Sequence, residues 1–191
     1  MSVKNPVQNV LIIGADIYGK VISEIIRAEE RHTIVGFLDD TPAKKNTSFC
    51  SLKILGDISQ LTKIVEDYRI DLVYIGIGDG RARNKIAAKL IAQGVPLGSC
   101  IHPSSVVSPS ARIGNGVIID ALCYVGPDVV IEDGVSIWPH CTISHNCIVG
   151  AFSSVMPSVT MAGHTKVPSL AKVKCGSVWP AHSLVASELQ S

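Results

Sequence analysis

The chain of 191 residues is 47% hydrophobic and 17% charged, with a formal net charge of +1. This composition excludes an intrinsically disordered chain, and the near-neutral charge gives no electrostatic reason to bind nucleic acid or an anionic membrane. No apolar run approaches the roughly 20 residues that a membrane-spanning helix needs. Residues 1–8 also lack the order of basic, apolar and small residues that marks a signal peptide. We therefore expect a cytoplasmic protein, a compartment that also fits six cysteines without a CxxC pair.

The charged residues are distributed unevenly along the chain. Residues 1–100 hold 24 of the 33 charged side chains, whereas residues 101–191 hold only 9. Proline and glycine accumulate where the composition changes. We therefore predict two domains, one over residues 1–98 and one over residues 99–191.

The N-terminal half alternates between short β-branched runs and apolar residues at helical spacing. In chain order, this pattern predicts strand 9–13, helix 18–30, strand 33–38, helix 58–68, strand 72–77 and helix 81–93. Such an alternation is typical of an α/β domain with a Rossmann-like parallel sheet. Ligands of these sheets bind beyond the carboxyl ends of the strands. Here those ends lie at residues 14–18, 39–40 and 78–79.

The loop over residues 14–21 comes close to two phosphate-binding motifs without matching either. Its Gly-x-x-x-x-Gly-Lys spacing ends in Val21, where a P-loop needs a Ser or Thr to hold magnesium. A dinucleotide-binding fingerprint needs a glycine in place of Asp16. Two interpretations stay open at this point: a strand-to-helix turn that needs glycine for its geometry, and a nucleotide-related site at a helix N-terminus.

The C-terminal half repeats with a period of six residues. An apolar residue stands at every sixth position from Ile101 to Val185, and a mostly small residue follows four positions after each. Hexapeptide periodicity marks a parallel β-helix, in which three repeats form one triangular coil of 18 residues. The apolar residues then point inward and stack roughly 4.8 Å apart. Three cysteines in the small column are expected to be buried packing residues: Cys123, Cys141 and Cys147.

Short motifs follow one another along nearly the whole chain in a specific order. They are Val10-Leu-Ile-Ile-Gly-Ala15, Gly36-Phe-Leu-Asp-Asp40, Leu55-Gly-Asp57, Ile77-Gly-Asp79, Ile101-His-Pro103 and His145-Asn-Cys-Ile-Val-Gly150. In this order they resemble the bacterial sugar O-acyltransferase and UDP-amino-sugar N-acetyltransferase family of the sialic acid and bacillosamine pathways. The resemblance implies a left-handed β-helix that assembles as a homotrimer, uses acetyl-CoA as acyl donor and needs no metal. It also implies an N-terminal domain that binds the sugar or nucleotide sugar.

The resemblance further implies the catalytic groups. The family's general base falls on His145, and an imidazole suits the removal of a proton from an attacking amine or hydroxyl. The family commonly has an acidic residue next, whereas Asn146 here can orient the ring but adds no charge. Gly163 falls where a backbone N–H stabilises the oxyanion. We expect acetyl transfer to an amino group on a nucleotide-linked sugar, in bacterial surface polysaccharide or glycan biosynthesis.

Other site residues are carried over from the family's motifs. The expected contacts with acetyl-CoA are Ser154, Gly163 and Cys175. The expected contacts with the substrate are Asp16, Ile17, Tyr18, Asp39, Asp40 and Gly78. Tyr18 and Ser154 both stand where the family has a histidine. His164 is expected on the same face as the base, one coil later.

Three other functions compete with this interpretation. One is a sugar O-acetyltransferase of the sialic acid type. Another is a catalytically weak β-helix binding protein, which Asn146 and a C-terminus shorter than the family's would favour. The third is a zinc hydratase, because His140-Cys-Thr-Ile-Ser-His145 has the His-x₄-His spacing of carbonic-anhydrase β-helices. That site needs a third histidine near Ser104, and the sequence has none there.

Overall fold

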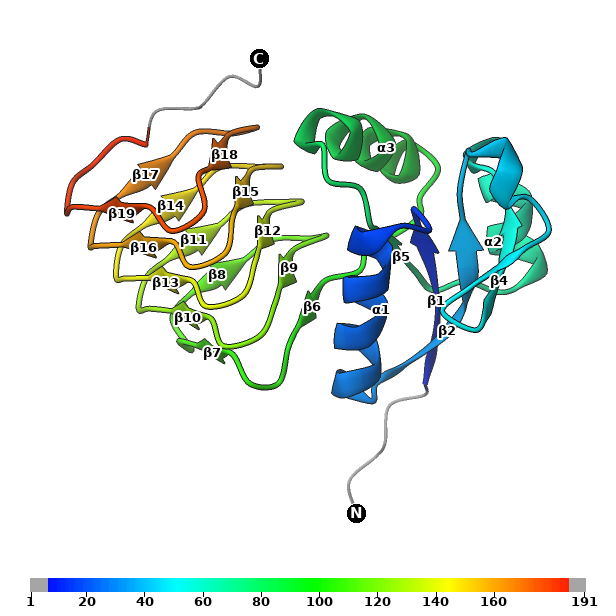
Figure 1. Ribbon diagram of the computed structural model, residues 1–191, viewed down its shortest axis with the longest axis horizontal. Coiled ribbons are helices and arrows are strands. Elements are labelled where there is room, and N and C mark those ends of the chain that lie inside the picture. The colour runs from blue at the N-terminus through cyan, green and yellow to red at the C-terminus, as the bar shows by residue number, and fades with distance from the viewer. Residues whose placement is uncertain (1–6, 186–191) are drawn as a thin grey trace.

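The computed structural model describes residues 7–185. Its N-terminal part is a sheet with helices on both faces (Figure 1). Its elements are β1 (Gln8–Ile13), α1 (Ile17–Glu29), β2 (His32–Leu38), η1 (Pro42–Lys44), β3 (Ser48–Phe49), β4 (Leu52–Gly56), η2 (Ile58–Gln60), α2 (Leu61–Asp67), β5 (Leu72–Ile75) and α3 (Gly80–Ala92). The strand order is β3-β4-β2-β1-β5, and only β3 runs antiparallel. Alternate β1 residues pack against α1 on one face and against α2 and α3 on the other. The predicted Rossmann-like parallel sheet is thus confirmed.

The sequence pattern did not predict η1, β3 and β4. The antiparallel strand has two residues, and β4 exposes Lys53 while it buries Ile54. Two residues are too few to establish a period of two in β3, and in β4 Lys53 interrupts the apolar run. Over residues 7–185, none of the helices has the length and apolar character needed to cross a membrane.

From Cys100 onward the chain forms a left-handed parallel β-helix of two-residue strands. These are β6 (Cys100–Ile101), β7 (Val106–Val107), β8 (Arg112–Ile113), β9 (Ile118–Ile119), β10 (Tyr124–Val125), β11 (Val130–Ile131), β12 (Ser136–Ile137), β13 (Thr142–Ile143), β14 (Ile148–Val149), β15 (Ser154–Val155), β16 (Thr160–Met161), β17 (Lys166–Val167), β18 (Lys172–Val173) and β19 (Val178–Trp179). Paired residues lie 18 positions apart, as Ile119 and Ile137 do. This spacing confirms the coil length predicted from the sequence.

The strands build three flat sheets. We call them the first sheet (β6, β9, β12, β15, β18), the second sheet (β7, β10, β13, β16, β19) and the third sheet (β8, β11, β14, β17). The second residue of each strand points inward, and these residues form one buried column with the small residues between strands. Cys123, Cys141 and Cys147 are buried in this column as expected.

The coils turn at three corners, and from residue 116 onward one residue of each corner has a left-handed backbone with φ between 56° and 69°. Only some of these residues are glycine; Asn146, His164 and His182 occupy successive turns of one corner. A left-handed conformation costs an ordinary residue about 1 kcal/mol. Backbone hydrogen bonds between coils hold it in place, such as the one from His164 N to His145 O at 3.1 Å. Corner side chains are therefore fixed in direction.

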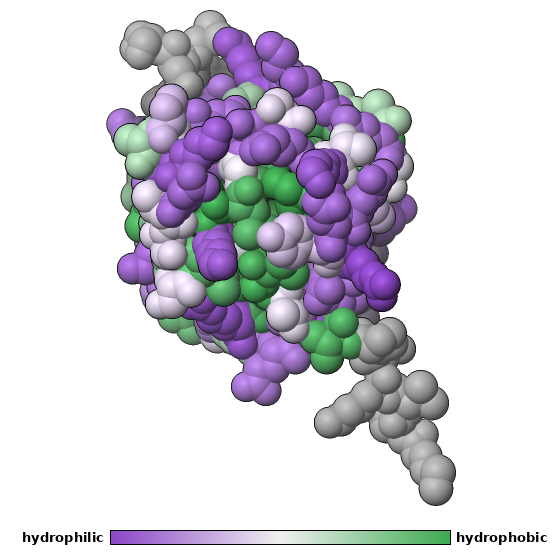
Figure 2. Space-filling model, turned by 90° about the vertical axis from the view of Figure 1, so that its right-hand side faces the viewer, coloured by the Kyte–Doolittle hydropathy of each residue, from purple (hydrophilic) through white to green (hydrophobic). Residues whose placement is uncertain are grey.

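The N-terminal part packs on the first sheet of the β-helix, as Figure 1 shows. The outward residues of four of its five strands are buried for that reason: Cys100, Ile118, Ser136 and Ser154 are at most 6% exposed, whereas Lys172 of β18 is half-buried. Cys100 and Ile118 belong to the same apolar cluster as α1 and β1. The opposite end of the N-terminal part has a hydrophilic rim around a smaller apolar area (Figure 2). The second and third sheets have no covering domain within residues 7–185, as the exposed Tyr124 and Lys166 illustrate.

Candidate active site

The corner between the second and third sheets carries the expected base. His145 lies between β13 and β14, and its Nδ1 is 2.9 Å from Asn146 Oδ1. Because an amide oxygen only accepts, the imidazole donates from Nδ1 and keeps a lone pair on Nε2. Asn146 thus holds the ring and its tautomer, and the exposed Nε2 side is suited to take a proton.

Gly163 lies one coil further along this corner, against the face of the imidazole. A Cβ at Gly163 would be 2.4 Å from Cε1 and 2.6 Å from Nε2 of His145, so only glycine leaves room for the ring. Within residues 7–185, the Gly163 N–H meets no hydrogen-bond acceptor. A free N–H beside a base is the arrangement that an oxyanion site requires.

Two further histidines continue the same corner. The rings of His145 and His164 meet edge to face with centroids 5.3 Å apart, so the exposed His164 lies on the same face as the base, one coil later. His164 stacks in turn on His182 at 4.7 Å. His140 occupies a different corner, between β12 and β13. In the described part of the chain, no group of three His, Cys, Asp or Glu side chains is arranged to hold a metal ion.

The expected substrate-binding residues of the N-terminal part lie in three different environments. Asp16 caps α1 by accepting from Ile17 N, and both residues are exposed. Asp39 is used internally, because it accepts from Ala15 N at 2.8 Å and pairs with Lys44 at 2.9 Å. These hydrogen bonds outweigh burial and lower the pKa of Asp39 to about 2. Asp39 therefore shapes the loop that follows β1, and its carboxylate is not free for a ligand.

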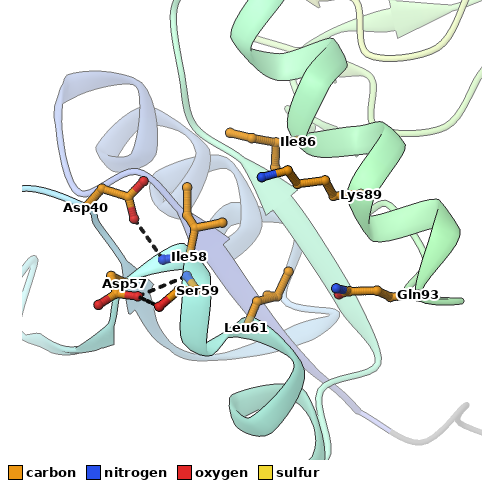
Figure 3. A pocket seen from close by; sticks show the side chains of 8 residues that line it. All are labelled: Asp40, Asp57, Ile58, Ser59, Leu61, Ile86, Lys89 and Gln93. Atoms are coloured by element: carbon orange, nitrogen blue, oxygen red, sulfur yellow. Dashed lines mark hydrogen bonds between the residues drawn. The ribbon is translucent and has the colours of Figure 1, made fainter.

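Asp40 lines a cavity of about 770 Å³ between η2, α2 and α3 (Figure 3). The cavity is lined by Asp40, Asp57, Ile58, Ser59, Leu61, Ile86, Lys89 and Gln93. Asp40 accepts from Ile58 N at 2.8 Å, which fixes η2 as one wall. Lys89 and Gln93 stand one helical turn apart on the opposite wall. Sequence reasoning missed these two residues, because nothing in helix 81–93 marks which exposed side chains face the strand ends.

Tyr18 and Gly78 meet at the junction between the two parts of the molecule. A Cβ on Gly78 would be 2.7 Å from the Tyr18 ring, so glycine is needed for this contact. The Tyr18 ring also meets Trp138 of the β-helix edge to face, with centroids 4.8 Å apart. Beside them lies a cavity of about 330 Å³, lined by Ile17, Tyr18, Val21, Asp120, Trp138, Pro139, Met156 and Pro157. Nothing in the sequence distinguishes Trp138, because it directly follows an ordinary inward position.

The expected coenzyme residues do not come together within one chain. Cys175 is exposed at the corner between the first and second sheets, away from Gly163. Ser154 is 6% exposed beneath the N-terminal part, and its hydroxyl bonds to Ser136 and Arg83. A coenzyme has no access to that hydroxyl, because the domain packed on the first sheet covers it.

Both parts of the chain match known families. Residues 9–90 match the PglD N-terminal domain, and residues 110–145 match the bacterial transferase hexapeptide (six repeats). The chain is 33% identical over 119 residues to UDP-N-acetylbacillosamine N-acetyltransferase of Bacillus subtilis (strain 168). That match covers 60% of this chain and 52% of the relative, so the chain spans about half the length of this curated relative.

Two solved structures share the fold along nearly the whole chain. The acetyltransferase domain of PglB from Neisseria gonorrhoeae FA1090, in complex with acetyl coenzyme A, is 27% identical with a TM-score of 0.85, over 92% of this chain and 83% of that one. PerB from Caulobacter crescentus, in complex with CoA and GDP-perosamine, is 28% identical with a TM-score of 0.76, over 95% and 90%. The chain therefore combines a region that matches the PglD N-terminal domain with a hexapeptide β-helix, and in both parts it is similar to amino-sugar N-acetyltransferases.

Proposed function

We propose that the protein is an acetyl-CoA-dependent N-acetyltransferase that acts on a nucleotide-linked amino sugar in bacterial surface polysaccharide or glycan biosynthesis. The observation that carries the proposal is the corner where Asn146 holds the His145 ring against Gly163. In this assignment residues 1–98 form the substrate-binding domain and residues 99–191 the acyltransferase domain. An amino acceptor is favoured because the named relatives act on or bind amino sugars, bacillosamine and perosamine.

The chemistry at the corner follows from the two groups present. His145 Nε2 takes the proton from the acceptor nitrogen as that nitrogen bonds to the thioester carbonyl carbon. The Gly163 N–H donates to the oxygen that becomes negatively charged in the tetrahedral intermediate. When the carbon–sulfur bond breaks, the imidazolium returns its proton to the leaving thiolate. The products are the N-acetylated sugar and coenzyme A, and the base is regenerated.

The nucleotide is assigned to the cavity between η2 and α3 (Figure 3). Its walls offer carboxylates of Asp40 and Asp57, which accept from N–H and O–H groups of a base or ribose. The ammonium group of Lys89 opposes them and suits a phosphate. The cavity lies beyond the carboxyl ends of β2 and β4, the expected ligand edge of such a sheet.

The position of His145 on the prism supports a homotrimer, which is part of this proposal. The base lies at the corner opposite the first sheet, and the N-terminal domain covers the first sheet. A sugar held by that domain therefore meets the base of a neighbouring copy. The outward residues of the second sheet suit such a contact because none is charged: Val106, Tyr124, Thr142, Thr160 and Val178.

The test is acetyl transfer from acetyl-CoA to UDP- or GDP-linked amino sugars, with hydroxyl analogues in parallel. Loss of the base in His145→Ala should lower kcat by about 100-fold to 10,000-fold while coenzyme binding persists. His102→Ala is the matched control, because His102 is half-exposed on the first coil and bonds only locally to Ser104. The proposal fails if the parent protein binds no coenzyme A, or if His145→Ala keeps parental activity. Faster turnover of the hydroxyl analogues would instead identify an O-acetyltransferase.

A further inference from the structure

Arg83 of α3 is buried between the N-terminal part and the β-helix, with 4% of its surface exposed. Its guanidinium reaches six oxygen acceptors. These are Ile77 O (3.1 Å), Gly78 O (2.9 Å), Gly134 O (3.3 Å), Phe152 O (3.0 Å), Ser153 O (3.1 Å) and Ser154 Oγ (3.1 Å). The first two belong to the loop after β5, and the other four belong to the β-helix. One side chain therefore ties both parts together.

No carboxylate neutralises this cation. Within residues 7–185, no carboxylate oxygen lies within 4.0 Å of an Arg83 nitrogen. Burial lowers the pKa of Arg83 to about 10, so the side chain stays charged at neutral pH. Carbonyl and hydroxyl groups supply all of the hydrogen bonds to this charge, and Asp79 adds a longer-range Coulombic attraction without a direct contact. A planar fork with five N–H groups can serve acceptors on two separate elements at once, which an ammonium group cannot do equally well.

The acceptors of Arg83 lie next to residues that matter for the proposed reaction. Gly78 contacts the Tyr18 ring, and that ring contacts Trp138. On the β-helix side, Ser154 also bonds to Ser136 Oγ at 3.1 Å. Gly80 approaches Phe152 O so closely that a Cβ would lie 2.2 Å from that oxygen. The start of α3 is therefore seated on the β-helix in a single position.

We propose that Arg83 is a positioning residue, which fixes the N-terminal domain on the β-helix and so sets where the acceptor amine stands relative to the base. This inference rests on the proposed acetyl transfer. Acceptor and coenzyme are assigned to different domains, so each domain binds its own ligand without Arg83. Only the transfer step needs the two domains in a fixed relative position, because a displacement of about 1 Å at the reacting atoms can lower the rate 100-fold.

Arg83→Ala should therefore separate catalysis from binding. The apolar cluster of α1 with Cys100 and Ile118 still joins the domains, so we expect the variant to fold. Its kcat should fall at least 30-fold, while KM for each substrate stays within threefold of the parent value. Arg83→Lys, which keeps the charge but loses the fork, should recover part of kcat. Arg81→Ala is the matched control, because Arg81 is exposed on the same helix two residues earlier.

Trp138 provides a readout that does not depend on activity. It is 9% exposed at the junction, and Trp179 is the only other tryptophan. In a Trp179→Phe background, acrylamide should quench Trp138 fluorescence more strongly after Arg83→Ala, and not after Arg81→Ala. This result together with the selective loss of kcat supports the inference. Unchanged kcat and quenching in an active parent background would overturn it, as would equal losses of kcat and of both binding steps. An inactive parent would instead count against the proposed function.

Discussion

The position of the candidate base, His145, depends on the absence of a side chain at residue 163. The His145 ring occupies the space in which a Cβ of residue 163 would lie, so Gly163→Ala should push the imidazole away from its present position. The backbone at Gly163 is not in the left-handed region, and alanine should therefore fold there normally. We expect kcat to fall by about 100-fold, since misplacing a catalytic group by roughly 1 Å has an effect of that size. Steady-state kinetics with both substrates measures this.

The control for that variant is a glycine with open space around it. Gly94, in the turn after α3, has no atom within 4 Å of an added Cβ but has a φ of 71°. Asparagine tolerates such a backbone, so Gly94→Asn should keep parental activity and stability. If Gly163→Ala also retained parental kcat, the position of the ring against Gly163 would have no role in transfer.

At the scale of elements, the loop after β1 is held by a carboxylate network rather than by apolar packing. Asp39 accepts from Ala15 and Thr41 and pairs with Lys44, which also donates to Ala15 O at 2.9 Å. The pKa of Asp39 is lowered from 3.8 to about 2, so this group stabilises the fold at pH values above its unfolded pKa. That stabilisation amounts to about 2 kcal/mol at pH 7, and roughly half of it is lost at pH 3.

Asp39→Asn tests this pH dependence. Relative to the parent, the variant should lose about 2 kcal/mol of unfolding free energy at pH 7, and the difference should shrink as the pH falls toward 3. Urea denaturation followed by circular dichroism measures both values. Asp67→Asn serves as control, because Asp67 forms only an exposed pair with Lys63 on α2 and should change stability little at either pH. A pH-independent difference for Asp39→Asn would contradict the assigned ionisation.

The sequence predicts the repeating parts of the fold, but it does not predict the contacts that depend on how the two parts of the chain pack together. A period of six predicts the inward column of the β-helix, because every coil repeats the same inward and corner positions. The contact of His145 with Asn146 also follows from the sequence, since the two are adjacent at a corner. The period does not tell which of three equivalent sheets the N-terminal part covers. The surroundings of Ser154 and Arg83 depend on that choice, and for this reason the sequence predicted neither the burial of Ser154 nor the contacts of Arg83.

For the whole molecule, the decisive feature is that the candidate base and the nucleotide cavity belong to opposite sides of the prism. The N-terminal domain covers the first sheet, while His145 lies where the second and third sheets meet. In a cyclic trimer every interface is the same, so each copy can lend its base to a neighbour and its cavity to the other neighbour. Reaction between domains of one chain would require the sugar to pass around the β-helix.

Mixing two inactive variants distinguishes these arrangements. His145→Ala lacks the base, and Ser59→Arg fills the nucleotide cavity with a long side chain. Each is expected to be inactive alone, yet trimers refolded together from equal amounts should regain about a quarter of parental activity, because random assembly in a symmetric trimer joins an intact base to an intact cavity at that frequency. Sites made within one chain would regain nothing, since every copy then carries one defect. Light scattering on the refolded mixture should give the mass of three chains, and a monomeric mass would refute the shared site.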